Sequence, residues 1–455
     1  MKIRKAFALF LYLTYFTSAL HAQYQPKPVD EFILGTDLSM VKAILDNEGI
    51  YKVDDSPKDV FSAFKEGEYE YVRLRIFHSP DENEANGTVN SLNYTLALAQ
   101  MVKEAGMKLL LDFHYSDTWA DPSKQNAPLA WSGLDFTSLN DSLYNYTKNV
   151  LNRFNEHNLT PDLVQTGNEI NHGFLWPQGS AWNGNVANYQ NFATLLKSAI
   201  KGVHDSNNGS SIPILLHSAT GGSITESQTF VDSLLKYNVE FDILGLSYYP
   251  CWHGTLTSLD ENLNFLSSGY EQTIMIVETN YNSDGVPSGD CVLSASQMPF
   301  PYTEQGQFDY LQAIYAITKK YERVKGLFYW GGDYIWAGDI GGSYSSLFHW
   351  QGNAQKALFA FQDTTSTSIQ PETPMFSDVL IYSTANKQLI VQLPEGSQGS
   401  NCICIYDITG KLQYKSQLQS NRNSVELGHL SPGVYIVTLE HNQHVFIREK
   451  VVFNH

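Results

Sequence analysis

The stretch Leu163-Val-Gln-Thr-Gly-Asn-Glu-Ile-Asn171 places an apolar strand, a glycine and then two polar residues, Asn168 and Glu169. Thr273-Ile-Met-Ile-Val-Glu-Thr-Asn280 has the same design, because its apolar strand also finishes on a glutamate, Glu278. Short apolar strands with polar residues at their ends are typical of parallel sheets whose chemistry lies at the C-terminal edge. The two stretches therefore predict a parallel-sheet protein with functional carboxylates where strands end.

Eight such apolar segments alternate with helical patterns along the first four fifths of the chain. The predicted strands cover residues 31–37, 71–77, 107–113, 162–166, 212–217, 241–247, 273–277 and 324–330. The predicted helices lie near 39–48, 90–105, 136–156, 187–203, 226–237, 259–266, 305–321 and 354–361. This alternation predicts an α/β fold, a (β/α)8 TIM barrel over residues 23–362. An open doubly wound sheet is the alternative, but no Gly-rich phosphate loop follows the first strand.

The pattern changes after a Ser/Thr/Pro-rich linker at residues 363–375. Short strand-like runs separated by turns fill residues 376–455, at 389–393, 401–406, 411–417, 424–427, 434–439 and 445–452. This spacing predicts a small all-β sandwich. No catalytic constellation occurs in it.

The N-terminus is typical of a signal peptide over residues 1–22. Lys2, Arg4 and Lys5 precede an apolar run at 6–16, and small residues follow. The run is too short to span a membrane. We therefore expect an exported protein, secreted or held at the outer cell surface, with no membrane insertion.

Composition narrows the class of partner. With 42% hydrophobic residues among 455, the chain is long and apolar enough for a packed globular protein, expected to be a monomer. Its formal net charge of -18 disfavours nucleic acid and anionic membranes as partners. A neutral partner fits this charge better.

The four cysteines give no zinc signature. Cys251 and Cys291 each follow a predicted barrel strand, and the sequence leaves open whether they form a disulfide. Cys402 and Cys404 lie two apart in a predicted strand and are interpreted as small apolar residues.

Polar and aromatic residues gather at the predicted strand ends, where barrel enzymes carry their active sites. The two glutamates are the predicted catalytic pair. Residues predicted to contact the substrate are Asp37, Arg73, His114, Trp119, Asn168, Tyr248, Trp330 and Asp333. Further indoles just past strand ends are candidate stacking platforms for a sugar chain, namely Trp176, Trp252 and Trp336.

The ends of the fourth and seventh strands face each other across a barrel mouth. Two carboxylates there can lie about 5–5.5 Å apart, the spacing of retaining glycoside hydrolysis. Glu169 follows an asparagine whose amide can bind a sugar hydroxyl, which favours Glu169 as acid/base. Glu278 ends its strand alone, which favours it as nucleophile.

These motifs resemble glycoside hydrolase family 53, the endo-β-1,4-galactanases. The matching stretches run in order along the barrel and include Leu111-Asp-Phe-His-Tyr-Ser-Asp-Thr-Trp-Ala-Asp-Pro122, Gln165-Thr-Gly-Asn-Glu169, Leu246-Ser-Tyr-Tyr-Pro-Cys-Trp252 and Val277-Glu-Thr279. The resemblance implies cleavage of neutral β-1,4-galactan with Glu169 as proton donor and Glu278 as nucleophile. No cofactor is implied.

The same resemblance raises a possible structural calcium ion, because bacterial family members can carry one in the loop after the seventh strand. Here that loop holds Asp284 and Asp290, a sparse set of carboxylates for calcium. The metal prediction is therefore none.

The C-terminal module resembles the sorting domain of the type IX secretion system. Its matching parts are Ile405-Tyr-Asp-Ile-Thr-Gly-Lys411, Leu430-Ser-Pro-Gly-Val-Tyr-Ile-Val437 and Lys450-Val-Val452. This resemblance implies secretion machinery as a partner. An accessory sugar-binding sandwich is the alternative.

Two other functions remain open at this point. Another retaining β-glycanase on the same barrel, a mannanase or cellulase, would keep both glutamates. A non-catalytic glycan-binding protein would not need them.

Overall fold

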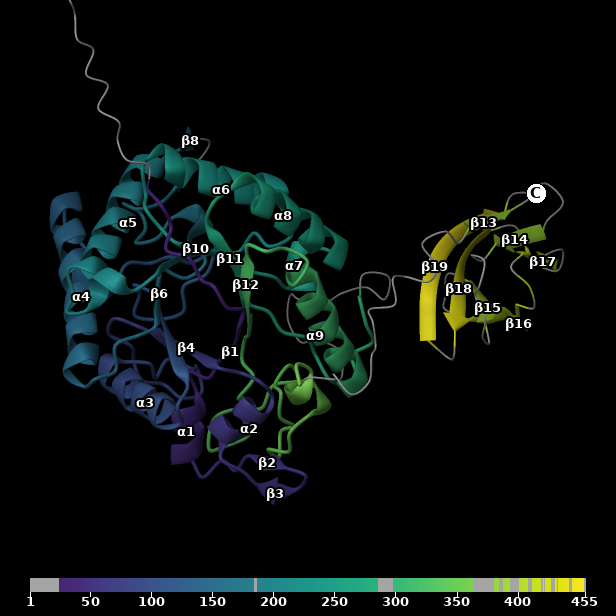
Figure 1. Cartoon of the computed structure of the whole chain (residues 1–455), viewed down its shortest axis with the longest axis horizontal. Coiled ribbons are helices and arrows are strands. Elements are labelled where there is room, and N and C mark those ends of the chain that lie inside the picture. Colours follow the sequence, from purple (N-terminus) through teal and green to yellow (C-terminus); the bar gives the residue numbers. More distant parts are fainter. Residues whose placement is uncertain are drawn as a thin grey trace, which may run out of the picture. The chain divides into compact units, whose positions relative to one another are not determined.

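Eight parallel strands close into a barrel (Figure 1), in which β12 pairs back onto β1. Each predicted strand overlaps an observed one, so the predicted TIM barrel is confirmed. The strand bounds are Ile33–Asp37 (β1), Tyr71–Ile76 (β4), Lys108–Phe113 (β5), Leu163–Thr166 (β6), Ile214–Ser218 (β9), Ile243–Ser247 (β10), Thr273–Glu278 (β11) and Val324–Tyr329 (β12).

The computed structural model describes residues 24–183, 186–284 and 298–362, and then 380–383, 388–392, 401–407, 411–418, 420, 422–426, 430–431, 433–441 and 444–453. The chain divides into two compact units, Met1–Gln362 and Asp363–His455. The predicted signal peptide (1–22) and linker (363–375) lie outside the described residues.

Helices surround the barrel strands, with α3 to α6, α8 and α9 forming much of the outer layer (Figure 1). Side-chain caps begin several of them: Ser91, Asp135 and Thr303 each accept a hydrogen bond from the backbone N–H three residues on. The bounds are Val41–Asp46 (α1), Val60–Glu66 (α2), Leu92–Glu104 (α3), Phe136–Glu156 (α4), Tyr189–His204 (α5), Ile224–Lys236 (α6), Pro250–His253 (α7), Leu256–Gly269 (α8) and Glu304–Thr318 (α9).

Some short elements differ from the prediction. Helix α2, capped by Asp59, was not predicted, although it buries four apolar residues. The last predicted helix is only a 3₁₀ turn, Lys356–Phe359. Two small hairpins also occur in loops, β2 (Lys52–Val53) with β3 (Ser56–Pro57) and β7 (Trp182–Asn183) with β8 (Val186–Ala187).

The barrel interior is layered, apolar toward the N-terminal ends of the strands and polar toward their C-terminal ends. The apolar interior cluster contains Ile33, Tyr71, Leu110, Leu163, Leu215, Ile243, Met275, Val277 and Phe328. Because side chains on one face of a strand recur every second residue, the next inward positions follow directly. They are occupied by polar side chains, Arg73, Asp112, Gln165 and His217, all fully or nearly fully buried. This polar layer forms the floor of the site.

The second unit consists of two antiparallel sheets around one apolar cluster, which agrees with the predicted all-β module. One sheet contains β13 (Leu380–Ser383), β14 (Gln388–Gln392) and β17 (Arg422–Glu426). The other contains β16 (Leu412–Gln417), β15 (Asn401–Asp407), β18 (Gly433–His441) and β19 (His444–Phe453). Their shared core includes Leu389, Val391, Ile403, Ile405, Val437 and Leu439.

Two further sequence predictions concern cysteines and membranes. Cys251 is disulfide-bonded, whereas Cys291, the partner that the sequence left open, lies outside the described residues. Cys404 is buried in β15, next to half-buried Cys402 in the same strand.

None of the helices in the described part of the chain has the length and apolar character needed to cross a membrane.

Candidate active site

Glu169 follows β6 in a backbone conformation that L-residues rarely adopt, with φ 49° and ψ 51°. Gly167 before it has φ 97°, and a Cβ there would lie 2.6 Å from Cγ2 of Ile170. Gln125 Nε2 donates to the backbone oxygens of Asn168 and Glu169, at 2.7 and 3.3 Å, and so stabilises this turn. Strained residues held by their surroundings in this way cluster at functional sites.

Glu278 reaches the barrel interior through an irregularity in β11. The register with β10 pairs Leu246 with Ile276 but Ser247 with Glu278, so that Val277 is an extra residue. A bulge of this kind shifts the side-chain alternation by one position. Val277 lies in the apolar interior cluster, and Glu278 contacts the polar layer above it, with only 7% of its surface exposed.

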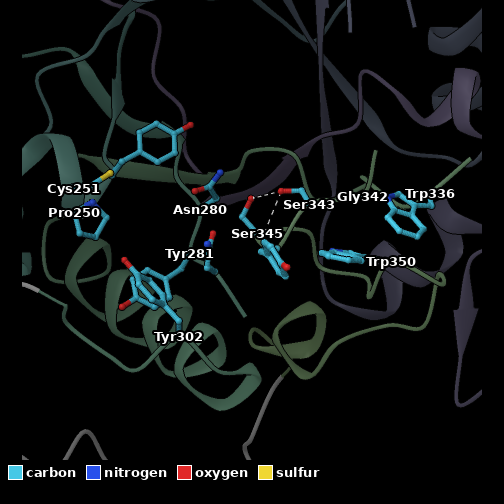
Figure 2. Close-up of a pocket in the computed structure, with 13 residues that line it drawn as sticks. Pro250, Cys251, Asn280, Tyr281, Tyr302, Trp336, Gly342, Ser343, Ser345 and Trp350 are labelled. Carbon is cyan, nitrogen blue, oxygen red and sulfur yellow. Dashed lines mark hydrogen bonds between the residues drawn. The ribbon is translucent and has the colours of Figure 1, made fainter. Parts of the chain in front are cut away.

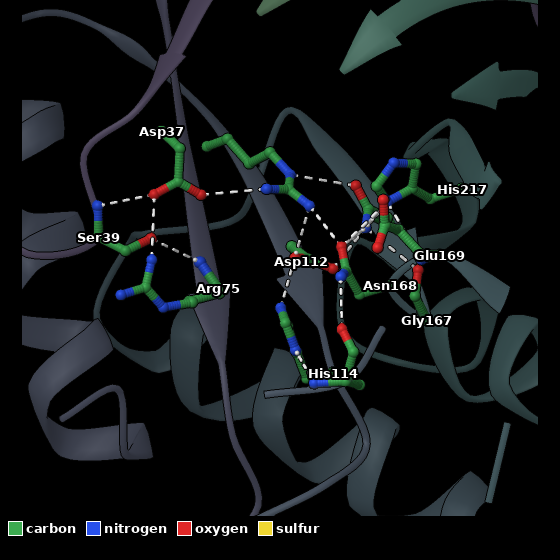
Figure 3. A network of polar contacts seen from close by, with 12 residues as sticks. Asp37, Ser39, Arg75, Asp112, His114, Gly167, Asn168, Glu169 and His217 are labelled. Carbon is green, nitrogen blue, oxygen red and sulfur yellow. Dashed lines mark hydrogen bonds and ion pairs between the residues drawn. The ribbon is translucent and has the colours of Figure 1, made fainter. Parts of the chain in front are cut away.

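Arg73 connects the two strand ends. Its Nη2 lies 2.8 Å from Oε1 of Glu278 and donates at 2.8 Å to Oδ1 of Asn168. The same guanidinium contacts Asp37 at 3.1 Å and Asp112 at 2.8 Å. Figure 3 shows this network extending from Asp37 to His217. Because the guanidinium is fixed by several acceptors, the orientation of Glu278 is fixed as well.

The two glutamates have different electrostatic environments. Burial and the charge of Glu278 raise the pKa of Glu169 to about 8, while a hydrogen bond from Ser247 opposes the rise. Burial also raises the pKa of Glu278, but there the Arg73 guanidinium opposes it by direct contact. Tyr249 adds a hydrogen bond to Oε2 of Glu278 at 3.0 Å. The first proton to leave the pair therefore comes from Glu278, and Glu169 keeps its proton near neutral pH.

Both glutamates line one cavity of about 730 Å³. Of the residues predicted to contact a substrate, five also line it, namely Arg73, His114, Trp119, Asn168 and Trp330. Trp119 packs 4.2 Å from the Arg75 guanidinium, and its ring centroid lies 6.2 Å from that of Trp330. The structure thus brings the predicted acid, the predicted nucleophile and two indoles to one surface.

The prediction for Tyr248 needs correction. Tyr248 is fully buried in the core outside the barrel strands, and its hydroxyl donates to the backbone oxygen of Gly254 at 2.9 Å. Its neighbour Tyr249 lines the cavity instead. Consecutive side chains of an extended segment point in opposite directions, so only one of the two tyrosines can reach the cavity.

Asp37 and Asp333 were also predicted to contact the substrate, and the structure places both elsewhere. Neither is among the residues that line the cavity. Asp37 pairs with Arg73 and with Arg75, whereas Asp333 accepts a hydrogen bond from the backbone N–H of Met40. Burial and nearby Asp37 raise the pKa of Asp333 to about 7. Asp37 therefore holds both arginines in place, while Asp333 anchors the backbone at Met40.

Trp252, a candidate stacking platform from the sequence, lines the cavity and is 58% exposed. Two other residues at the site were not selected from the sequence. His253 lines the cavity and accepts a hydrogen bond from the backbone N–H of Tyr249. Ser247 is fully buried below the cavity and donates to Oε1 of Glu169 at 2.6 Å. Serine at the end of an apolar strand gives little sequence signal, since the hydroxyl is equally common in a core.

The loop considered for a calcium ion follows β11. Asp284 is exposed, while Asp290 lies outside the described residues. Within the part of the chain that the structure describes, no group of three or more His, Cys, Asp or Glu side chains is arranged to hold a metal ion.

Replacing Arg73 by lysine is expected to move the acid limb of the pH–activity profile to higher pH by about one unit. Lysine keeps the charge but cannot contact Glu278, Asp112 and Asn168 together, so the pKa of Glu278 rises further. Because the nucleophile must be ionised, activity is then lost at a higher pH on acidification. Profiles of kcat/KM for R73K and R75K test this, since Arg75 contacts Asp37 and not Glu278. An equal shift in both variants would contradict the assignment.

An ionised carboxylate and a protonated carboxyl in one partly open cavity can together cleave a glycosidic bond. The ionised group attacks the anomeric carbon, and the protonated group gives its proton to the departing oxygen. The surrounding indoles offer apolar faces to the sugar rings.

Comparisons with known proteins agree with this chemistry. Residues 33–371 match the model of Glycosyl hydrolase family 53, and residues 384–454 match that of a Secretion system C-terminal sorting domain. The chain is 34% identical to the arabinogalactan endo-beta-1,4-galactanase A of Aspergillus niger, over 57% of this chain and 73% of that protein. It is 32% identical to the endo-beta-1,4-galactanase of Bacillus subtilis, over 66% of this chain and 70% of that protein.

Among solved structures, the catalytic domain of the family 53 enzyme of Ignisphaera aggregans superposes with a TM-score of 0.66 at 35% identity. That comparison covers 74% of this chain and 98% of the other. The chain belongs to glycoside hydrolase family 53.

Proposed function

We propose that this glycoside hydrolase is a secreted endo-β-1,4-galactanase that acts with retention of configuration. Galactanase activity is that of its relatives from Aspergillus niger and Bacillus subtilis. The observation that carries the proposal is the placement of Glu169 and Glu278 on one cavity in unlike environments.

In the first step, ionised Glu278 attacks the anomeric carbon while Glu169 gives its proton to the leaving oxygen. The C–O bond to the leaving chain breaks as the bond to Glu278 forms. In the second step, Glu169 takes a proton from water, which attacks the same carbon and releases Glu278. Arg73 and Tyr249 orient the nucleophile throughout.

Internal cleavage is supported by two further cavities that continue the catalytic one. A cavity of about 600 Å³ shares Asn171, His172 and Glu226 with it and is lined by Trp176, Tyr189 and Phe230. A cavity of about 460 Å³ shares Tyr249 and carries Trp336 and Trp350 (Figure 2), whose ring centroids lie 5.2 Å apart. Aromatic surfaces on two sides suit a sugar chain that extends past the cleavage point in both directions.

We assign the Trp176 cavity to the leaving chain, because the segment after the proton donor builds it. Trp176→Ala is then expected to lower kcat/KM on galactan about 10-fold. An aryl galactobioside has no leaving sugar chain, so its hydrolysis should be nearly unchanged. Trp350→Ala is the matched control. It should leave binding of the leaving chain unchanged and weaken the binding of substrates whose glycone chain, on the other side of the cleaved bond, is long. Equal losses on both substrates for W176A would contradict this assignment.

Export is proposed from the sorting-domain match at residues 384–454 and the predicted signal peptide. A net charge of -18 suits a neutral polysaccharide better than an anionic one. We propose that the second unit directs secretion and takes no part in hydrolysis.

Release of reducing ends from linear galactan, mannan and carboxymethyl cellulose tests the substrate. Activity on galactan with a mixture of internal products supports the proposal. Activity confined to mannan or cellulose would replace it by another β-glycanase, and binding without turnover would replace it by a glycan-binding protein.

A further inference from the structure

A chain of hydrogen bonds leads from Glu169 into the protein. Ser247 Oγ lies 2.6 Å from Oε1 of Glu169, and His217 Nε2 lies 2.8 Å from the same Oγ. Both Ser247 and His217 are fully buried, whereas Glu169 lines the cavity. The described residues offer Oε2 of Glu169 no hydrogen-bond partner, so Oε1 is its anchored oxygen.

The number of hydrogens along this chain is limited. The serine hydroxyl has one, and a neutral imidazole has one. Burial lowers the pKa of His217 well below its usual value, and the charge of Arg73 lowers it further. The opposing Asp112 carboxylate and the more distant His114 and His253 complete the titratable surroundings of His217. His217 is therefore neutral, and the position of its single hydrogen has consequences for Ser247.

If His217 carries its hydrogen on Nε2, it donates to Ser247, and Ser247 must donate to Oε1 of Glu169. Nδ1 then accepts from the backbone N–H of Glu169 at 3.3 Å and from Gln165 Nε2 at 3.1 Å. An acidic proton on Glu169 is confined to Oε2 in this arrangement, because Oε1 accepts the serine hydrogen.

If the hydrogen is on Nδ1 instead, it points to Oδ1 of Asn168 at 3.0 Å. Nε2 then accepts from Ser247, and Oε1 of Glu169 must carry the acidic proton and donate it to Ser247. That proton faces the protein and cannot reach a leaving oxygen. In this second arrangement the backbone N–H of Glu169, which is 3.3 Å from Nδ1, would lose its acceptor among the described residues, whereas Oδ1 of Asn168 keeps the hydrogen bond from Arg73 at 2.8 Å in either arrangement. The first arrangement is favoured.

We propose that His217 and Ser247 are positioning residues that keep the acidic proton of Glu169 on Oε2, the oxygen available to the substrate. This inference rests on Glu169 being the acid/base of the proposed function. Oε1 stays an acceptor when Glu169 gives its proton to the leaving oxygen and when it takes one from water, so the buried hydrogens need not move during the cycle.

The histidine tautomer tests this without any substrate. In ¹⁵N-histidine-labelled protein, His217 is expected to be the Nε2–H tautomer from pH 6 to pH 9, assigned by the signals missing from His217→Gln. If His217→Gln does not fold, the His217 signals are identified instead as the imidazole signals that shift most in Ser247→Ala, because Ser247 contacts His217 directly. The Nδ1–H tautomer, or a protonated imidazole, would overturn the proposal.

Kinetics provide the second test. Ser247→Ala removes the donor to ionised Glu169, so the pKa of Glu169 should rise and the alkaline limb of kcat/KM should move up by about one pH unit. The pKa of Glu169 also depends on three charged groups that the substitution leaves in place: Glu278 and Asp121 raise it, and Arg73 lowers it. Ser247→Thr keeps the hydroxyl, so its alkaline limb should lie at the wild-type pH. Ser218→Ala is the control, because Ser218 is equally buried beside His217 but pairs with Thr220.

An unchanged alkaline limb in Ser247→Ala would overturn the positioning role. These measurements can use any substrate that the wild-type enzyme hydrolyses. Failure of the wild-type enzyme on galactan would instead refute the proposed substrate, so the two failures are distinguishable.

Discussion

Glu278→Gln is expected to lower kcat on galactan about 10⁵-fold while leaving galactan binding largely intact. The amide has nearly the shape of the carboxylate but cannot attack the anomeric carbon, so no glycosyl-enzyme forms. Steady-state hydrolysis and calorimetric binding of a galacto-oligosaccharide measure the two effects separately.

Asp242→Asn is the matched control for Glu278→Gln. Asp242 is a buried carboxylate at the start of β10, where it accepts hydrogen bonds from Tyr24 and from the backbone N–H of Ile214. Its loss should lower the melting temperature and leave kcat of the folded enzyme near the wild-type value. Substantial residual turnover in Glu278→Gln would show that another group is the nucleophile.

Glu169→Ala is expected to slow galactan hydrolysis about 10²- to 10⁴-fold, the usual contribution of a general acid. Glycosides with strongly activated aryl leaving groups need no proton in the first step, so bond cleavage should be nearly normal for them. The second step then becomes slow, because water has lost its base. Added azide should restore turnover and give the β-galactosyl azide.

The pH dependence gives a second signature of Glu169. Its pKa of about 8 means that the wild-type kcat/KM should fall above that pH, as the acid loses its proton. In Glu169→Gln this alkaline limb should disappear, since an amide does not titrate there. Survival of the limb in the variant would assign the acid to a different residue.

The barrel itself was predictable from the sequence, because each buried strand is a short apolar run and each helix has an apolar face. The two glutamates were identified for the same reason, since each lies at or just after the end of such a run. The short helix α2 escaped detection, as two turns carry too few residues for a periodic pattern.

The depth and direction of other side chains could not be predicted in this way. Tyr248 and Tyr249 are equivalent in sequence, and only the path of the chain after β10 decides which faces the cavity. Asp37 resembles a substrate ligand until the arginines that it contacts are placed, and Asp333 does so until its complete burial is known. The contact between His217 and Ser247 joins neighbouring strands whose sequences are 30 positions apart.

The central claim is that Glu278 becomes covalently bonded to the sugar while Glu169 exchanges protons. Incubation with a 2-deoxy-2-fluoro galactobioside that carries an activated leaving group should trap this intermediate, and mass spectrometry of the digested protein locates it. We predict one fluorosugar on the peptide that contains Glu278. A label on another residue, or first-formed galactan products of inverted configuration, would contradict the account.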